Sequence, residues 1–254
     1  MKERLFRFKE FAVRHELSAM KVGVDGVLLG AWADVSGNTL LDVGTGCGLL
    51  ALMALQRNPG LQVLGIDIHA PSIEEAQANA ADTPWDDKVR FDCRSFRRQL
   101  SMGWRFDLII SNPPFFNAGV NSPKDDRERS RHAADLSPQA LIVHATKLLN
   151  PGGRLCMITP RDQLDGLLAL AQTHRLVPRR LTEVTTVEGK APKRLLSEWE
   201  CNIGTHQGAS AGGDTVADAP ECTPTLLSIE EGKGANRRFS KEYMTLCTPF
   251  YLHF

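Results

Sequence analysis

The 254-residue sequence has no CxxC pair, no excess of either charge and no apolar run long enough to span a membrane. Its 30 basic residues balance 30 acidic ones, so net charge alone gives no argument for a nucleic-acid or membrane partner. The six cysteines are widely separated, which predicts a reduced, cytoplasmic protein without a structural metal. The start of the chain also lacks the apolar centre of a signal peptide.

What the sequence does have is a glycine-rich turn between a strand and a helix. Residues 39–43 form an apolar strand pattern, and residues 49–57 form an apolar helix pattern. The turn between them carries three glycines, Gly44, Gly46 and Gly48. This order lets backbone amides approach a ligand at a helix N-terminus. A second strand, residues 63–67, ends in Asp67 about twenty residues after the turn, the usual spacing for a ribose-binding carboxylate.

The spacing of these glycines discriminates between cofactors. A dinucleotide-binding turn needs a glycine or alanine three residues after its second glycine, and this position holds Leu49. The pattern opened by Asp42 fits a pocket for S-adenosylmethionine better than one for a pyrophosphate, with Asp42 near the methionine end of the cofactor. A third short strand covers residues 88–92, and the loop after such a strand often contacts the adenine. Asp92 and Ser95 are both candidates for that contact.

A stiff turn ends the fourth strand pattern, residues 106–111. The sequence there is Asn112-Pro113-Pro114-Phe115, and proline cannot continue a sheet ladder. Asn-Pro is also a common turn opener, so the motif alone fits a plain strand end equally well. The carboxyl ends of strands in open α/β sheets are, however, where ligands bind. Because the first and fourth strands are neighbours there, we predict that the turn faces the methyl group of the cofactor.

This turn suits a planar conjugated amino group as the methyl acceptor. The side-chain oxygen of Asn112 and the backbone carbonyl of Pro113 can each accept one N–H of that group, which directs the nitrogen lone pair at the methyl group. Phe115 offers a stacking face worth roughly 1–3 kcal/mol for a base. We therefore predict that Asn112, Pro113 and Phe115 are the catalytic residues, and that Asn112 also contacts the cofactor.

Residues 42–48 and 112–115 together resemble the signature of class I amino methyltransferases, which act on adenine, cytosine or glutamine. Three further segments resemble a bacterial family of tRNA (adenine-N6) methyltransferases that act on adenine 37 of valine tRNA; they are residues 8–11, 20–32 and 250–252. The sequence departs from that family at Val24, where threonine is usual, and at Phe115, where tyrosine is frequent. It also departs at Ser95, which stands in the place of an adenine-binding acid.

The resemblance implies an α/β, Rossmann-like class I methyltransferase fold. Its sheet is expected to be seven-stranded and mostly parallel, with a final antiparallel strand and helices on both faces. Residues 1–254 then form one domain, in which residues 1–35 act as a lid and Lys21 and Asp25 line the cofactor or base pocket. S-adenosylmethionine is the implied cofactor and a tRNA anticodon loop the implied partner. No dimer helix is evident in the sequence, so we expect a monomer.

The rest of the chain predicts further helices and strands. Helix patterns cover residues 137–149, 162–173 and 239–248, and strand patterns cover residues 154–159, 176–187, 195–203 and 225–229. Residues 204–224 are rich in glycine, alanine and threonine, which predicts a flexible insertion. Cationic side chains in segment 117–135 and in turn 190–194 predict a basic surface beside Asn112. Its members are Arg127, Arg129, Arg131, Lys190, Lys193 and Arg194.

Two other functions fit parts of the sequence. Protein glutamine N5-methylation uses the same Asn-Pro-Pro turn, but enzymes of that kind carry a separate N-terminal helical domain. The first strand here already begins at Thr39, which leaves too little chain before it for such a domain. A non-catalytic RNA-binding protein with this fold is the alternative from another class. The glycine turn, Asp67 and Asn112 together favour an enzyme.

Overall fold

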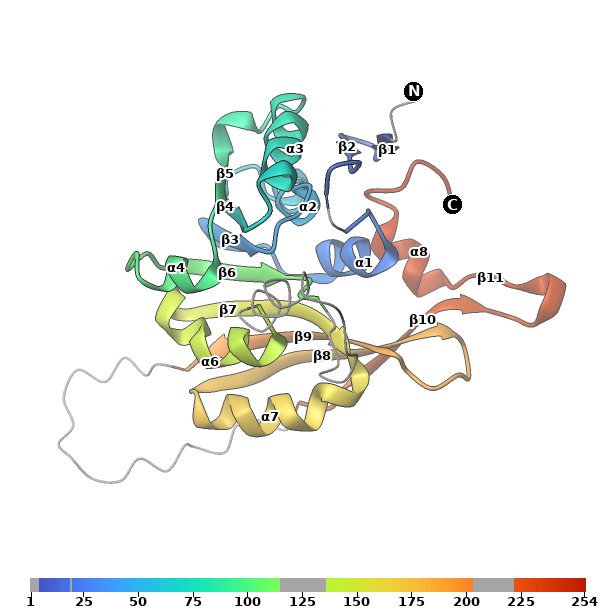
Figure 1. Ribbon diagram of the computed structural model, residues 1–254. Helices are drawn as coiled ribbons and strands as arrows, with labels where there is room; N and C mark the ends of the chain where they lie inside the picture. Colours follow the sequence, from blue (N-terminus) through green and yellow to red (C-terminus); the bar gives the residue numbers. More distant parts are fainter. Residues whose placement is uncertain (1–4, 19, 115–135, 203–221) are drawn as a thin grey trace, which may run out of the picture.

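The strand that ends at the Asn112 turn lies inside a large mixed sheet (Figure 1). The computed structural model describes residues 5–18, 20–114, 136–202 and 222–254. Within these ranges nine strands form the sheet, namely β3 (Thr39–Val43), β4 (Gln62–Asp67), β5 (Val89–Cys93), β6 (Phe106–Ser111), β7 (Leu149–Pro160), β8 (Leu176–Val187), β9 (Arg194–Cys201), β10 (Thr225–Glu231) and β11 (Arg238–Phe239). Their order across the sheet is β11-β10-β8-β9-β7-β6-β3-β4-β5.

Helices and a small hairpin complete the described structure. The helices are α1 (Val24–Trp32), α2 (Leu49–Arg57), α3 (Ala70–Ala81), α4 (Phe96–Leu100), α6 (Pro138–Leu148), α7 (Leu164–Thr173) and α8 (Lys241–Cys247). Short 3₁₀ segments occur at Asp86–Lys88, Arg161–Gln163 and Gly234–Asn236. An antiparallel pair, β1 (Leu5–Arg7) and β2 (Ala12–Arg14), precedes α1. None of the helices in the described part of the chain is long and apolar enough to cross a membrane.

Seven of the strands form the predicted class I methyltransferase core. Strands β3 to β8 all run in the same direction, whereas β9 is antiparallel and lies between β7 and β8. The prediction of a mostly parallel sheet with a final antiparallel strand is confirmed for these seven strands, of which β9 is the last in the sequence. The predicted strand count is too low, because β10 pairs in parallel with β8 and β11 pairs antiparallel with β10. These two strands cover the sheet edge that β8 would otherwise expose.

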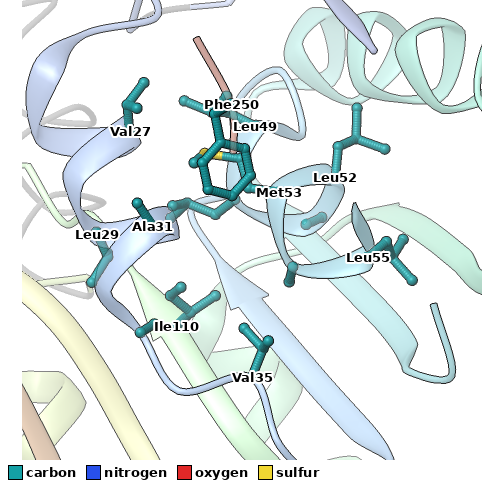
Figure 2. Packing of buried hydrophobic residues seen from close by; sticks show 14 of the residues in the cluster. Val27, Leu29, Ala31, Val35, Leu49, Leu52, Met53, Leu55, Ile110 and Phe250 are labelled. Carbon is teal, nitrogen blue, oxygen red and sulfur yellow. The ribbon is translucent and has the colours of Figure 1, made fainter. Parts of the chain in front are cut away.

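Helices cover both faces of the sheet, as predicted. α1, α2, α3 and α8 pack on one face, and α4, α6 and α7 pack on the other (Figure 1). Gly30 lets α1 approach α2 closely, since a Cβ at this position would lie 2.5 Å from the Met53 sulfur. Figure 2 shows Phe250, from the tail after α8, beside Met53 and Leu49 in the same buried cluster. The tail thus packs back onto the body of the protein.

Some predicted boundaries are wrong. The strand predicted at residues 154–159 begins earlier, because β7 already starts at Leu149; within it Gly152 has a φ of 72° and the β6–β7 register shifts. The predicted terminal helix begins only at Lys241, because the two residues of β11 pair with β10 before it. Two predicted segments fall mostly or wholly outside the described residues, namely the insertion 204–224 and the arginine-rich segment 117–135.

Candidate active site

Three strand ends converge at one edge of the sheet. β3, β4 and β6 are parallel neighbours, and their carboxyl ends carry the glycine turn, Asp67 and Asn112 respectively. The hydroxyl of Ser111 donates to the carbonyl of Val43 at 2.7 Å, which ties the last residue of β6 to the last residue of β3. The predicted methyl-donor loop, ribose acid and acceptor turn therefore lie side by side, as expected for a parallel sheet.

The glycine turn presents backbone to the site. Gly46 has a φ of 54°, and a Cβ built on it would meet nothing within 4 Å, so the turn is open at this point. The N–H of Gly46 donates to Asp67 Oδ2 at 3.0 Å, which fixes the turn against the acid. Gly48 is required for a different reason, because a Cβ there would lie 3.0 Å from Phe91 and 3.3 Å from Ala76. Because Gly48 has no side chain, the start of α2 can pack closely against Phe91 of β5 and Ala76 of α3.

A cavity of about 310 Å³ lies over this turn. It brings together several of the predicted site residues, namely Lys21, Asp25, Gly44, Gly46 and Asn112. The Oδ1 atom of Asn112 is buried and has no hydrogen-bond partner among the described residues. Leaving such an acceptor unpaired costs on the order of 1–3 kcal/mol, unless a ligand donates to it. Asn112, which lines this cavity, therefore carries a buried acceptor that lacks a partner among the described residues.

A smaller cavity of about 40 Å³ also borders Gly44. Asp67 and Ser95 both line it. Asp67 Oδ1 accepts the backbone N–H of His69 at 2.9 Å, which orients the carboxylate at the end of β4. The hydroxyl of Ser95 caps α4 by accepting the backbone N–H of Arg98 at 3.2 Å. The predicted ribose acid and one of the two predicted adenine contacts thus share one recess beside the glycine turn.

The other candidate for the adenine contact, Asp92, faces different partners. Its carboxylate pairs with Arg90 at 2.8 Å and with Arg94 at 2.6 Å. Asp92 is not among the described residues that line the recess shared by Asp67 and Ser95. A carboxylate already held by two guanidinium groups would lose these bonds in order to bind an adenine amino group. The geometry therefore favours Ser95 over Asp92.

Asp42 lies beneath the glycine turn and is fully buried. Its Oδ2 atom accepts the hydroxyl of Thr45 at 2.6 Å and the backbone N–H of Ala51 at 3.2 Å. Its Oδ1 atom has no partner in the described part of the chain. Burial raises the pKa of Asp42 to about 7, against the opposing effect of the two hydrogen bonds, and the charge of Asp67 raises it further. In this position Asp42 holds the turn against the start of α2.

One buried carboxylate holds the segment that precedes α1. Glu75 of α3 accepts the backbone N–H groups of Glu16, Leu17 and Ser18 at 2.5, 2.9 and 2.9 Å. It also accepts the Ser18 hydroxyl at 2.5 Å. Burial raises the pKa of Glu75, but these four hydrogen bonds outweigh burial and the pKa is lowered overall. Residues 20–26, which follow directly, form one wall of the 310 Å³ cavity.

Lys21 and Asp25 line that cavity, but the charges of both side chains have partners within the protein. The ammonium group of Lys21 donates to the carbonyls of His15, Glu16 and Ser18 at 2.7, 2.8 and 3.3 Å. Asp25 Oδ2 accepts Nε of Arg194 at 2.8 Å. This pair links Arg194 of β9 to α1 and offsets its charge, so the predicted basic surface, which stays a prediction, includes a carboxylate at this point.

Comparison with known proteins identifies the chain. A family model described as the methyltransferase small domain matches residues 26–174. A tRNA1(Val) (adenine(37)-N6)-methyltransferase of Porphyromonas gingivalis strain W83 is 44% identical, over 97% of this chain and 94% of its own. The chain belongs to the tRNA1(Val) (adenine(37)-N6)-methyltransferase family. A Phocaeicola vulgatus protein of the same name is 35% identical, over 98% of this chain and 97% of its own.

The solved structures agree on the fold of this family member. A structure described as a predicted O-methyltransferase from Agrobacterium tumefaciens aligns with a TM-score of 0.59, over 89% of this chain and 96% of that one. The two sequences are 17% identical, so the likeness concerns the fold alone. Together with the family membership, it confirms the predicted class I methyltransferase architecture and the prediction that the chain is an enzyme.

Part of the predicted methyltransferase site lies outside the described residues. This part comprises Phe115, Arg127, Arg129 and Arg131. Pro113 is described and is buried directly after Asn112. Of the other predicted members of the basic surface, Lys190 and Lys193 are exposed. They follow β8 at the same sheet edge as Asn112, because β8 and β6 run in the same direction.

Three residues that shape this methyltransferase site were not identified from the sequence, namely Gly26, Thr45 and Glu75. A Cβ on Gly26 would lie 3.0 Å from Leu49 Cδ2 and 4.0 Å from Asn112 Nδ2, so the missing side chain makes room at the acceptor turn. In the sequence, the Asp25-Gly26 pair is the feature from which the role of Gly26 could be predicted. Glu75 shares the buried face of α3 with Ile73 and Ala76, and a carboxylate on an apolar helix face is the signal there.

Proposed function

We propose that this chain transfers a methyl group from S-adenosylmethionine to the N6 amino group of adenine 37 in the anticodon loop of valine tRNA. The observation that carries the proposal is Asn112, which lines a cavity together with the glycine turn and whose buried Oδ1 has no partner among the described residues. The names of relatives that match along almost the whole chain supply the substrate. A tRNA anticodon loop is then the partner, and a cytoplasmic location follows from the substrate.

The residues around the two cavities fit S-adenosylmethionine. Gly46 leaves open space beside the backbone just before α2 begins, so a ligand can approach the positive end of this helix. Asp67 offers a carboxylate to ribose hydroxyls at the end of β4, and Ser95 offers a hydroxyl to the adenine from the shared recess. When bound, S-adenosylmethionine supplies an electrophilic methyl group attached to a sulfonium.

Asn112 and Pro113 orient the amino group that receives the methyl group. The lone pair of an aromatic amine is delocalised into the ring, so the nitrogen is a weak nucleophile. When Asn112 Oδ1 and the Pro113 carbonyl each accept one N–H, they hold the nitrogen in place and stabilise the positive charge that develops on it. The hydrogen bond from Ser111 to Val43 fixes the turn before the substrate arrives, which makes the orientation effective. No strong base is needed, since the methylated nitrogen is positively charged and strongly acidic and would lose its proton to water.

A glutamine side-chain amide would fit the same pair of acceptors. What favours adenine is the 44% identity to a tRNA enzyme along 97% of this chain. A non-catalytic role would not account for the open glycine turn or for an Asn112 oxygen that lacks a partner among the described residues. Adenine methylation is therefore the function that the site supports best.

The test is a methylation assay with defined substrates. Purified protein is incubated with methyl-labelled S-adenosylmethionine and valine tRNA that lacks modifications, and the labelled nucleotide is mapped by mass spectrometry. We expect one methyl group on N6 of adenine 37, and none when a purine without the 6-amino group replaces that adenine. A release-factor peptide with a glutamine acceptor is the parallel substrate. Label on the peptide and not on the tRNA would overturn the proposal in favour of glutamine methylation.

A further inference from the structure

A second cavity of about 570 Å³ lies beside the candidate active site. It shares Val24 and Asp25 with the 310 Å³ cavity that Asn112 lines, so the two lie next to each other at the start of α1. Its other walls come from the ends of β8 and β10, from β11, from α8 and from the tail that follows α8. β8 and β10 run in the same direction as β6. The cavity therefore opens at the same sheet edge as the Asn112 turn.

Four aromatic side chains form one wall of this cavity, which we call the aromatic pocket; they are Phe239, Tyr243, Tyr251 and Phe254. The rings of Phe239 and Phe254 meet at 85° with centroids 5.7 Å apart. Tyr243 is buried and its ring lies 5.3 Å from that of Phe239. Phe239 is 43% exposed and Phe254 is 46% exposed. An exposed ring held by buried neighbours is a preformed surface for a planar apolar ligand.

The charged residues of the aromatic pocket favour an anionic ligand. Three are cations, Lys193, Arg194 and Arg237, and two are carboxylates, Asp25 and Glu230. Each carboxylate pairs with an arginine, Asp25 with Arg194 and Glu230 with Arg237. The surplus positive charge therefore belongs to Lys193, which is exposed at the start of β9. A planar group with an attached phosphate matches both the rings and this lysine.

We infer that the aromatic pocket binds an unpaired nucleotide next to the target adenine of the anticodon loop, with its base stacked on Phe239. This inference rests on the proposed function. When the target base enters the 310 Å³ cavity, the nucleotides before and after it lie close to the same sheet edge. The aromatic pocket adjoins the cavity at that edge. A volume of about 570 Å³ accommodates one nucleotide. β10 and β11, which supply part of its wall, lie outside the seven-stranded core, so they add this surface to a common methyltransferase fold.

A double-mutant cycle between protein and RNA tests the inference. Phe239→Leu removes the ring and keeps an apolar side chain, whereas Phe239→Tyr keeps the ring. Leu226→Ala is the matched control, since Leu226 is 62% exposed on β10 and does not line the pocket. Each protein is titrated with an anticodon stem-loop that carries an abasic site at the target, at the nucleotide before it or at the nucleotide after it. The thermal midpoint of each variant reports that it is folded.

We expect Phe239→Leu to weaken binding of the intact stem-loop about tenfold. Phe239→Tyr and Leu226→Ala should leave the affinity within about twofold of wild type. An abasic site at one flanking position should weaken wild-type binding by a similar factor and add no further loss in Phe239→Leu. At the target position the two losses should multiply. The inference would be overturned if the losses from Phe239→Leu and from the abasic site multiplied at both flanking positions. It would also be overturned if the two losses failed to multiply at the target position alone, because the pocket would then bind the target base.

Failure of this inference is distinguishable from failure of the proposed function. Wild-type methylation of the intact tRNA is measured in the same preparation. If wild type methylates adenine 37 and the cycle shows no coupling at a flanking position, only the pocket assignment is wrong. If wild type binds S-adenosylmethionine and methylates no tRNA, the proposed function is wrong and the pocket assignment is wrong with it.

Discussion

The hydroxyl and the backbone N–H of Ser18 both donate to Glu75 Oε2, at 2.5 and 2.9 Å. Ser18 belongs to the segment that leads into the cavity wall, and Glu75 belongs to α3 on the body of the protein. Two bonds to one carboxylate oxygen thus connect the wall of the candidate active site to the central sheet. The other Glu75 oxygen accepts two more N–H groups from the same segment. Glu75 therefore ties residues 16–18 to α3, while Lys21 binds the carbonyls of the same segment.

Glu75→Gln should weaken cofactor binding. A glutamine at this site presents an NH₂ group to N–H and O–H donors, and a buried donor of Ser18 that loses its acceptor costs roughly 1–3 kcal/mol. We expect the Kd for S-adenosylmethionine to rise about tenfold and the thermal midpoint to fall. Calorimetric titration measures the first and a melting curve the second. Glu74→Gln, on the exposed side of the same helix, is the control and should change neither.

Asp42→Asn should change how stability depends on pH. Burial raises the pKa of Asp42 from 3.8 to about 7, so the native protein holds a proton that the unfolded chain releases between those values. Between these values the native state binds more protons than the unfolded state. The contribution of Asp42 to the free energy of unfolding therefore falls by about 1.4 kcal/mol per pH unit as pH rises to about 7. The asparagine variant lacks this loss. We expect its stability advantage to grow by roughly 2–3 kcal/mol from about pH 5 to pH 8 in urea unfolding.

Other carboxylates do not obscure this comparison. For Asp34, Glu75 and Asp107, burial raises the pKa, but hydrogen bonds outweigh burial and each pKa is lowered overall. The stability that these groups contribute is lost only as pH falls through their lowered pKa values, which lie below the window of Asp42. A difference between Asp42→Asn and wild type that stays constant with pH would show that Asp42 is ionised in the native protein throughout.

Gly46→Ala should damage the site more than the fold. The residue has a φ of 54°, where an L side chain costs about 1–2 kcal/mol, and the added Cβ would occupy open space at the cavity. Gly103→Ala is the matched control, because Gly103 has a φ of 71° and equally open surroundings away from the cavity. We expect a similar loss of stability in both variants and a KM for S-adenosylmethionine raised at least about tenfold in Gly46→Ala only. Equal KM values in the two would place the cofactor elsewhere.

Ser95→Asp should strengthen cofactor binding. Aspartate caps a helix as well as serine does, so α4 keeps its start, and a carboxylate accepts a hydrogen bond from the adenine amino group more strongly than a hydroxyl. We expect the Kd for S-adenosylmethionine to fall about threefold to tenfold by calorimetric titration. Asp92→Asn serves as the comparison and should leave the Kd unchanged. The reverse pattern would assign the adenine contact to Asp92.

The core of the fold could be predicted because its signals are local. The buried strand before the glycine turn, the helix after it and Asp67 at the next strand end all follow from residues close in sequence. β10 and β11 extend the sheet through pairings that no local pattern specifies. The predicted helix start at Phe239 lies two residues before the start of α8 at Lys241. Ser240 caps α8 by accepting the N–H of Tyr243. That serine is a signal that sequence reasoning can use.

The candidate site could be predicted only in part, for a similar reason. Asn112 and Gly46 belong to motifs whose spacing carries their chemistry, and the structure brings both to one cavity. The Ser18–Glu75 contact joins residues 57 positions apart, and the Asp25–Arg194 contact joins residues 169 positions apart. Such partners depend on how the whole chain folds. The sequence shows the positive charge of Arg194 and so predicts that it belongs to a basic surface. It does not show that the fold places the carboxylate of Asp25 beside it.

The central claim is that Asn112 orients the acceptor amino group, and a single-turnover measurement tests it most directly. Asn112→Ala removes the unpaired oxygen from the cavity, so we expect the methyl-transfer rate at saturating tRNA and S-adenosylmethionine to fall at least about 100-fold. The Kd for S-adenosylmethionine should stay within about threefold. Asn202→Ala, at an exposed position just after β9 on the opposite sheet edge, should behave as wild type. An unchanged rate in Asn112→Ala would contradict the account.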